Sequence, residues 1–334
     1  MEERTARELI CRTGRELLET GLVARTWGNV SCRADGEHFL ITPSGLGYHK
    51  TQPEDIARVE LSTMAWEGQR KPSSEKGIHA AAYTLFPEVG FVIHTHQSCA
   101  SALGVAGFAA MDITEDERLA LGGLAVAAYG LPGTKKLKGA VAAAMAGGAQ
   151  TVLMAHHGVV VCGRDKEQAM ERALLLEEIC RRNLHLPEDG SRRLPEEGVQ
   201  ALLTAVRREI PAAEVSGGEY AVRWADRGQV LRAQLDDMAQ MLGGQVPCVE
   251  PLAEDVIREL KKRDAVFVKG VGALVKGEDP DDREALCLLT EKSALCALHA
   301  AGLGVKVHLS RLDAALMHLI YQKNMRKGRA DYER

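Results

Sequence analysis

The sequence has few aromatic residues, which make up only 4% of its 334 positions. Alanine, glycine, leucine and valine are plentiful instead, and a core of small aliphatic side chains is typical of α/β proteins with closely packed layers. No apolar run is long enough to cross a bilayer, and residues 1–4 carry no apolar signal stretch. We therefore expect a cytoplasmic protein that makes no membrane contact.

An excess of charge is also lacking. The 42 basic residues stand against 46 acidic ones, which gives a formal net charge of −4. A nucleic-acid-binding surface needs a clustered basic excess, whereas short basic runs such as residues 135–138 fit solvated helix starts. We therefore expect no nucleic-acid partner.

Cysteine pairs and nucleotide-binding loops are missing as well. None of the eight cysteines belongs to a Cys-x-x-Cys motif, so we expect reduced and mostly buried thiols. The chain has no Walker-type phosphate loop, and Gly270 and Gly272 lack the third glycine of a dinucleotide-binding loop. These absences argue against a nucleotide-dependent enzyme.

Apolar periodicity and turn residues divide the chain into elements. They predict helices over residues 3–19, 73–85, 98–103, 135–146 and 165–184, and strands or tight turns over 26–32, 37–42, 89–96 and 151–161. A segment rich in proline, glycine and acidic residues follows at 186–198 and indicates a linker. We therefore predict an α/β protein with two domains, residues 1–187 and residues 198–334.

The second domain contains a partial repeat of the first. Residues 151–165 align with residues 265–279, and a weaker alignment places residues 92–103 against residues 230–241. Where the first copy carries His94, His96, His156 and His157, the second copy carries Arg232, Gln234, Gly270 and Val271. The second domain is therefore either a repeat that lost its polar groups or a strand–turn–helix arrangement that is similar by chance.

Two histidines lie at the end of an apolar strand. His94 and His96 are two residues apart, so on a strand both imidazoles point to one face and can bind a divalent metal. Taken alone, the motif is explained equally well by two hydrogen-bonded histidines at a strand end. The other candidate ligands decide between the two explanations.

A second histidine pair and a glutamate supply those ligands. His156 and His157 close the second apolar strand, and strand alternation directs only one of them inward. Glu75 begins a helix, where the positive helix end favours its carboxylate. One carboxylate and three imidazoles would complete a tetrahedral zinc site, and a carboxylate that leaves the metal could serve as acid and base.

Short polar side chains and glycines gather at three places. These groups are Thr26-Trp27-Gly28-Asn29, Ser44-Gly45 and Ser73-Ser74. Glycines let backbone N–H groups approach an anion, and the last group begins a helix, where phosphate binds readily. Taken singly, each group is better explained as a helix cap or a turn.

As an ordered set, these motifs resemble the class II aldolase/adducin family and its L-fuculose-phosphate aldolase-like members. The set comprises Thr26-x-Gly28-Asn29, Thr42-Pro43-Ser44-Gly45, Ser73-Ser74-Glu75, His94-x-His96 and His157-Gly158. The resemblance covers roughly residues 5–185. It implies a three-layer α/β/α domain around a mainly antiparallel sheet, and homo-oligomers that are usually fourfold-symmetric tetramers.

The resemblance also implies a role for each matching residue. The zinc ligands would be Glu75, His94, His96 and His157, with Glu75 doubling as acid and base. The phosphate-binding positions would be Thr26, Asn29, Ser44, Gly45, Ser73 and Ser74. Tyr129, which lies ahead of a Gly-Thr pair, would handle the aldehyde oxygen. Where the family usually has Asn-His-Gly, this chain has His156-His157-Gly158. The change keeps the implied metal ligand, His157, and alters the neighbouring residue, which would change the wall of the pocket.

The implied reaction is reversible aldol cleavage of a phosphorylated ketose to dihydroxyacetone phosphate and a small aldehyde. Zinc would act as the Lewis acid, although manganese or cobalt could occupy such a site. Sugar-phosphate 4-epimerisation, dehydration and decarboxylation use the same family site and stay open, while the context of Tyr129 favours the aldolase.

A non-catalytic role is the alternative from another functional class. The adducin branch uses the fold as an interaction module, but it is expected to lack the histidines that this chain retains. In the second domain no ligand set is evident, so a structural or oligomerisation role is favoured there.

Overall fold

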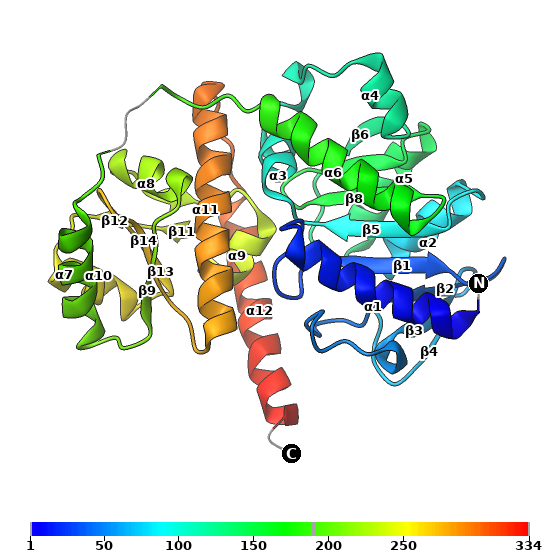
Figure 1. Cartoon of the computed structure of the whole chain (residues 1–334), viewed down its shortest axis with the longest axis horizontal. Coiled ribbons are helices and arrows are strands. Elements are labelled where there is room, and N and C mark those ends of the chain that lie inside the picture. The colour runs from blue at the N-terminus through cyan, green and yellow to red at the C-terminus, as the bar shows by residue number, and fades with distance from the viewer. Residues whose placement is uncertain (1, 189–191, 333–334) are drawn as a thin grey trace. The chain divides into compact units, whose positions relative to one another are not determined.

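The chain forms two compact units, and the computed structural model describes residues 2–188 and 192–332 (Figure 1). The first unit contains Met1–Gly104 and Phe108–Asn183, and the second contains Val105–Gly107 and Leu184–Arg334. The first unit thus ends slightly before residue 187. The expected linker, 186–198, is shorter than predicted because helix α7 (Glu196–Arg207) begins inside it, with acidic residues in its first turn. Residues 189–191 of that linker lie outside the described residues.

The first unit is built around an eight-stranded sheet in the order β4-β3-β2-β1-β5-β8-β7-β6. Its strands are β1 (Asn29–Arg33), β2 (His38–Ile41), β3 (Ala57–Glu60), β4 (Trp66–Glu67), β5 (Phe91–Thr95), β6 (Leu124–Ala127), β7 (Thr151–Met154) and β8 (Val159–Gly163). All neighbouring strands are antiparallel except β6 and β7. The mainly antiparallel sheet implied by the family resemblance is confirmed.

Helices cover both faces of this sheet. On one face, α1 (Glu3–Glu19) packs on β1, and α6 (Lys166–Arg182) packs on β5 and β8. On the other, α2 (Lys76–Leu85) and α5 (Lys135–Ala146) share a buried core with strands such as β5 and β7. Shorter helices are η1 (Pro53–Asp55), α3 (Ser98–Val105), η2 (Phe108–Ala110) and α4 (Glu115–Ala120). The three-layer arrangement is therefore confirmed.

The local sequence explains why these elements form where they do. Helix α1 buries Ala6, Ile10 and Leu17 along one face, which is the spacing of an amphipathic helix. Strand β5 is buried at all five positions, as expected of a central strand. The predicted apolar segment 151–161 folds as a hairpin of β7 and β8, and His156 adopts φ 64° in the turn.

The second unit has its own sheet and its own apolar core. The four-stranded sheet has the order β12-β13-β14-β9. Its strands are β9 (Ala213–Ser216), β12 (Cys248–Val249), β13 (Ala265–Val268) and β14 (Gly272–Lys276). The helices that follow α7 are α8 (Glu219–Asp226), α9 (Asp236–Leu242), α10 (Ala253–Leu260), α11 (Pro280–Gly302) and α12 (Arg311–Tyr332). The core lies where α7 and α10 meet this sheet.

The weaker of the two sequence alignments does not survive in the fold. Residues 230–241 contain β10 (Leu231–Arg232), which pairs with β11 (Gln245–Val246) in a separate two-stranded sheet. The neighbour of β14 is β9, so β9 takes the position beside β14 that β5 takes beside β8. The sequence alignment failed because β9 is a four-residue strand without the long apolar run of β5.

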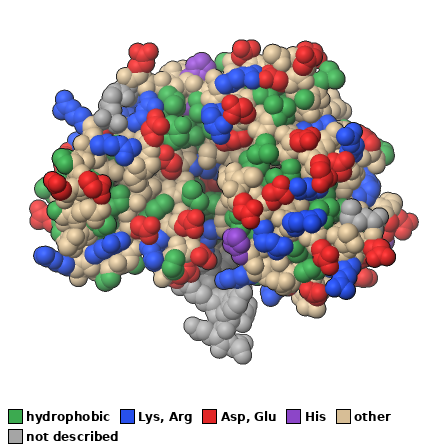
Figure 2. Space-filling view, viewed as in Figure 1, with side chains coloured by type: hydrophobic (Ala, Val, Ile, Leu, Met, Phe, Trp, Pro, Cys, Tyr) green, Lys and Arg blue, Asp and Glu red, His purple; other side chains and the backbone are tan. Residues whose placement is uncertain are grey.

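The surface charge agrees with the balanced composition, and the state of the cysteines agrees with the expected reduced thiols. Figure 2 shows acidic and basic side chains interspersed over one face. Six of the eight cysteines are buried and two are half-buried, and all eight are free thiols. Within the described residues, no helix has both the length and the apolarity that crossing a bilayer requires.

Candidate metal and catalytic site

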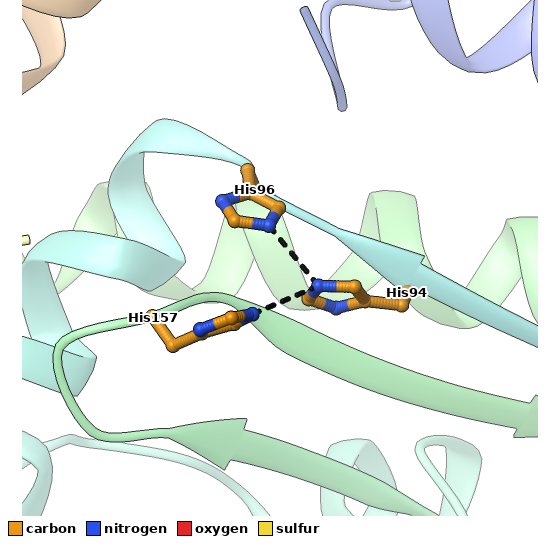
Figure 3. Close-up of side chains that lie close together, drawn as sticks. All are labelled: His94, His96 and His157. Carbon is orange, nitrogen blue, oxygen red and sulfur yellow. Dashed lines mark hydrogen bonds between the residues drawn. The ribbon is translucent and has the colours of Figure 1, made fainter. Parts of the chain in front are cut away.

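Three histidines converge where β5 ends and the β7–β8 hairpin turns (Figure 3). The Nε2 atom of His94 lies 3.0 Å from Nε2 of His96 and 3.1 Å from Nε2 of His157. Their ligand atoms all lie within 4.8 Å of one another, and His94 and His157 are buried. The sequence expected one histidine of the second pair to point inward, and the structure shows that it is His157.

The donor geometry fits a divalent metal. Tetrahedral bonds of about 2.0–2.1 Å place two nitrogen ligands roughly 3.3 Å apart, close to the separations observed here. His94 Nδ1 lies 2.8 Å from the carbonyl oxygen of Val159, to which only a protonated Nδ1 can donate. The lone pair of His94 Nε2 is therefore directed at its two neighbours, as a metal ligand requires.

Glu75 completes the cluster from the start of α2, where it is the N-cap residue. Its Oε2 lies 3.2 Å from His94 Nε2, and its Oε1 lies 3.2 Å from His157 Nε2. Burial raises the pKa of this carboxyl, but positive charge on the adjacent His94 and His157 imidazoles outweighs burial and holds the pKa well below its usual range; a cation bound to the neutral rings would supply positive charge in the same place. The carboxylate is thus ionised beside the three nitrogens and can bind a cation with them.

The predicted phosphate-binding residues fall into two groups. A short antiparallel contact joins residues 42–45 to residues 71–74, because Ser44 N donates to Lys71 O and Ser73 N donates to Thr42 O. This contact brings Ser44 and Gly45 together with Ser73 and Ser74. Ser73 is buried and its hydroxyl accepts from Glu75 N at 3.2 Å, so it supports the start of α2. Ser74 is exposed.

Thr26 and Asn29 belong to the other group. Thr26 is exposed in the turn before β1, whereas Asn29 is buried on β1 directly opposite His94. The Asn29 amide nitrogen donates to Glu75 Oε2 at 3.1 Å. The structure therefore gives Asn29 a contact with the carboxylate of Glu75 that the sequence did not indicate.

Tyr129 lies beside the hairpin that carries His157. Its ring meets the His156 ring edge to face at a centroid distance of 5.5 Å, and the Lys136 ammonium group lies 5.9 Å from the Tyr129 ring centroid. The His156 ring therefore contacts Tyr129, and the cluster of three histidines does not include it. Tyr129 remains a candidate at the edge of the site.

Sequence reasoning missed several neighbours of the site. Lys135 and Lys138 line a cavity of about 100 Å³ with Ser74 and Glu75, although the basic run had been assigned to a solvated helix start. The Trp27 ring lies 6.2 Å from the His96 ring.

Buried polar residues behind Glu75 were missed as well. His79 follows Glu75 by four residues on α2, and Ser31 follows Asn29 by two on β1. A spacing of four residues on a helix places His79 beside Glu75, and a spacing of two on a strand places Ser31 beside Asn29. This periodicity could have identified both residues from the sequence.

The chain resembles known proteins over its first unit. Residues 8–184 match the family model described as the Class II Aldolase and Adducin N-terminal domain. The 5-methylthioribulose-1-phosphate/5-deoxyribulose-1-phosphate aldolase of Rhodospirillum rubrum is 37% identical over 166 residues, which cover 49% of this chain and 74% of that protein. The L-ribulose-5-phosphate 4-epimerase UlaF of Salmonella paratyphi B is 40% identical over 96 residues, which cover 28% of this chain and 42% of that protein.

A solved structure agrees with this similarity. The crystal structure of YgbL from Escherichia coli, described by the alternatives aldolase, epimerase and decarboxylase, has a TM-score of 0.51 and 26% sequence identity. The superposition covers 58% of this chain and 96% of that one. The chain therefore belongs to the class II aldolase/adducin family through its first unit.

Proposed function

We propose that the chain is a metal-dependent aldolase that reversibly cleaves a ketose 1-phosphate into dihydroxyacetone phosphate and a small aldehyde. The observation that carries this proposal is the convergence of His94, His96 and His157 on one point beside the ionised carboxylate of Glu75. Such a donor set suits zinc, and manganese or cobalt can occupy it as well. The adducin-like alternative, a module without catalysis, gives no reason for this buried arrangement.

The metal would supply Lewis-acid polarisation of the substrate carbonyl. The chain's own groups would handle protons and positions. Cleavage breaks the C3–C4 bond of the ketose, and the C4 hydroxyl loses its proton as C4 becomes the aldehyde carbon. Tyr129 would assist at that oxygen, the Glu75 carboxylate would take up the released proton, and the resulting carboxyl group would deliver it to C3, which completes dihydroxyacetone phosphate.

The polar turns would bind the phosphate group of the substrate. Thr26, Asn29, Ser44, Gly45, Ser73 and Ser74 are the candidates for this role. Ser74 and the lysines 135 and 138 line one cavity with Glu75, so a cationic wall is available beside the hydroxyl groups. The phosphate group is remote from the reacting bond, and its binding would hold that bond in position in the site.

The similar proteins favour a short substrate. The Rhodospirillum rubrum relative is named for 5-methylthioribulose 1-phosphate and 5-deoxyribulose 1-phosphate, and the match covers most of that protein. Cleavage of 5-deoxyribulose 1-phosphate between C3 and C4 yields dihydroxyacetone phosphate and acetaldehyde. The match to the 4-epimerase is shorter, so we rank epimerisation second.

For the second unit we propose a degenerate repeat of the second half of the first. The sheet order β12-β13-β14-β9 reproduces β6-β7-β8-β5, with one parallel pair followed by two antiparallel pairs in each. One glutamate in each unit also makes the same kind of contact. Glu177 accepts from the first backbone N–H groups of α3, and Glu291 accepts from those of α8.

Within its described residues, the proposed repeat lacks histidines at the positions that correspond to the candidate metal ligands. With β9 in register with β5, the residues in place of His94 and His96 are Val215 and Gly217. Residues just before α7 lie over this position: Arg193 donates to the Gly217 carbonyl at 3.1 Å, and Leu194 donates to the Gly270 carbonyl at 2.8 Å. We therefore infer a structural or oligomerisation role for the second unit.

The test is coupled detection of dihydroxyacetone phosphate from a panel of ketose 1-phosphates. Wild type and His94→Ala are assayed side by side, and the bound metal of each is quantified. We expect metal-dependent cleavage by the wild type alone. Stoichiometric metal without cleavage would favour epimerisation, dehydration or decarboxylation, and absence of metal from both proteins would contradict the catalytic proposal.

A further inference from the structure

A chain of buried hydrogen bonds runs from the interior of the first unit to Glu75. The Tyr83 hydroxyl lies 2.7 Å from Ser31 Oγ, which lies 2.6 Å from His79 Nδ1. On its other side, His79 Nε2 hydrogen-bonds Asn29 Oδ1, and Asn29 Nδ2 lies 3.1 Å from Glu75 Oε2. Tyr83, Ser31, His79 and Asn29 are between 0% and 3% exposed, so these hydrogen bonds are shielded from bulk solvent.

The chemistry of the groups fixes the direction of every bond. The Asn29 amide nitrogen can only donate and lies 3.1 Å from Glu75 Oε2, so the amide oxygen Oδ1 is turned towards His79. An amide oxygen also only accepts, so His79 carries its proton on Nε2 and presents a lone pair at Nδ1.

The remaining two bonds follow from that tautomer. Ser31 donates to His79 Nδ1, and the Tyr83 hydroxyl then donates to Ser31. All donors point towards Glu75, and such aligned bonds polarise one another in a low-dielectric interior.

A neutral His79 is essential to this arrangement. Burial lowers the pKa of His79 to about 3. A charged imidazole would present N–H on both sides and would lose its bond from Ser31. The ring therefore keeps one donor and one acceptor at neutral pH.

We propose that His79 is a positioning residue for the reaction: through Asn29 it holds Oε2 of Glu75 in place and so orients the carboxylate for proton transfer. This inference rests on the proposed function and assigns His79 no contact with substrate. A carboxylate held on one oxygen keeps its other oxygen, Oε1, directed at His157. Fixing that orientation before the reaction removes a reorganisation cost from the proton-transfer step.

Two substitutions distinguish a positioning role of His79 from a role in core packing alone. In His79→Gln the amide nitrogen reaches the place of Nε2 and can still donate to Asn29. In His79→Asn the shorter side chain reaches only the place of Nδ1, towards Ser31. Both remove a buried ring, so a structural role predicts similar losses of stability for the two.

The kinetic test compares these variants with the wild type. We expect His79→Gln to keep kcat within about threefold and His79→Asn to lower it roughly 10–100-fold, as for partners that orient site residues. KM and bound metal should stay close to wild type in both. Equal losses in kcat, or a loss that falls on KM or on metal content, would overturn the inference.

A spectroscopic test works even if the reaction is not aldol cleavage. In the full-length protein labelled with ¹⁵N at its histidines and asparagines, the ring resonance lost in His79→Gln identifies His79, and the Asn29 side-chain amide is observed in the same samples. We expect a neutral ring protonated at Nε2, and a protected Asn29 amide that persists in His79→Gln and exchanges faster in His79→Asn. A ring protonated at Nδ1, or an unchanged Asn29 amide in both variants, would overturn the inference. Absence of product from every ketose phosphate in wild type would instead contradict only the proposed reaction.

Discussion

His156 and His157 are adjacent in sequence and face different surroundings. His156 lies in the left-handed region of backbone conformation, at φ 64°, and its ring contacts Tyr129. His157 turns to His94 and Glu75. The turn therefore directs one histidine to the proposed metal site and the other to Tyr129.

This division predicts opposite outcomes for two substitutions. His157→Ala should reduce bound metal below about a tenth of the wild-type content, because it removes a ligand from the set. His156→Asn should retain the metal, since asparagine tolerates the left-handed conformation. Metal analysis of both purified proteins checks this, and equal loss from both would show that the pair acts jointly.

Protonation of His79 should make the protein less stable in acid. Its pKa in the folded state, about 3, lies below the unfolded value of 6.5, so the unfolded chain binds the proton first. The stabilisation is complete above pH 6.5 and is lost as pH falls towards 3. The expected loss is about 1.4 kcal/mol per pH unit, or roughly 2 kcal/mol between pH 6.5 and 5.

Urea unfolding of the chelated protein at these two pH values measures that loss. The depressed pKa of Glu75 gives stability that is present above its unfolded value of 4.5 and is lost as pH falls below that value, so it adds little to the change between pH 6.5 and 5. His79→Gln is the control and should show a clearly smaller decrease in the free energy of unfolding. An equal decrease would attribute the acid sensitivity to other groups, such as His299.

At the scale of elements, glycines allow the site-bearing segments to approach one another. A Cβ atom at Gly28 would lie 2.3 Å from the His94 carbonyl oxygen, and one at Gly158 would lie 2.3 Å from the Thr95 carbonyl oxygen. Backbone fills both spaces, so no side chain can move aside. The turn before β1 and the β7–β8 hairpin are thus held against the end of β5, where the histidines meet.

Gly158→Ala should therefore displace the hairpin and weaken the metal site. We expect destabilisation of roughly 1–3 kcal/mol from overpacking, together with loss of metal affinity. Gly139→Ala is the matched control, because this position on α5 has no atom within 4 Å of the new Cβ and should gain about 0.5–1 kcal/mol. Thermal unfolding and metal titration of both variants check this, and intact metal affinity in Gly158→Ala would contradict the packing argument.

At the scale of the whole molecule, the two units each have a sheet and an apolar core, but they differ in their candidate metal ligands. The first unit contains the three-histidine cluster with Glu75. In the second, Val215 and Gly217 stand at the proposed counterparts of His94 and His96. One chain should therefore bind about one metal ion.

Hydrogen exchange followed by mass spectrometry tests this difference. Chelation should raise exchange in peptides from the start of α2, β5 and the β7–β8 hairpin, because binding stabilises the elements that supply ligands. Peptides from β9, β13 and β14 should not change. In His94→Ala the chelator should have no effect, and a metal-dependent change in the second sheet would contradict the proposed loss of its site.

Much of the fold and of the candidate metal site was predictable from sequence. Periodicity placed α1 and α5 at their observed bounds, because both helices present continuous apolar faces. The His94-x-His96 spacing specifies its own geometry, since strand alternation sets two imidazoles on one face. The ordered motifs indicated the family, which the match over residues 8–184 confirms.

Only the tertiary structure decided which distant groups meet. Strand pairing sets Asn29 opposite His94, and this pairing makes Asn29 a partner of Glu75. The pairing of β9 with β14 likewise depends on contacts across the chain, so local sequence aligned the wrong segment. Local sequence determines periodicity, caps and turns, whereas contacts between residues far apart in the chain depend on how whole elements pack.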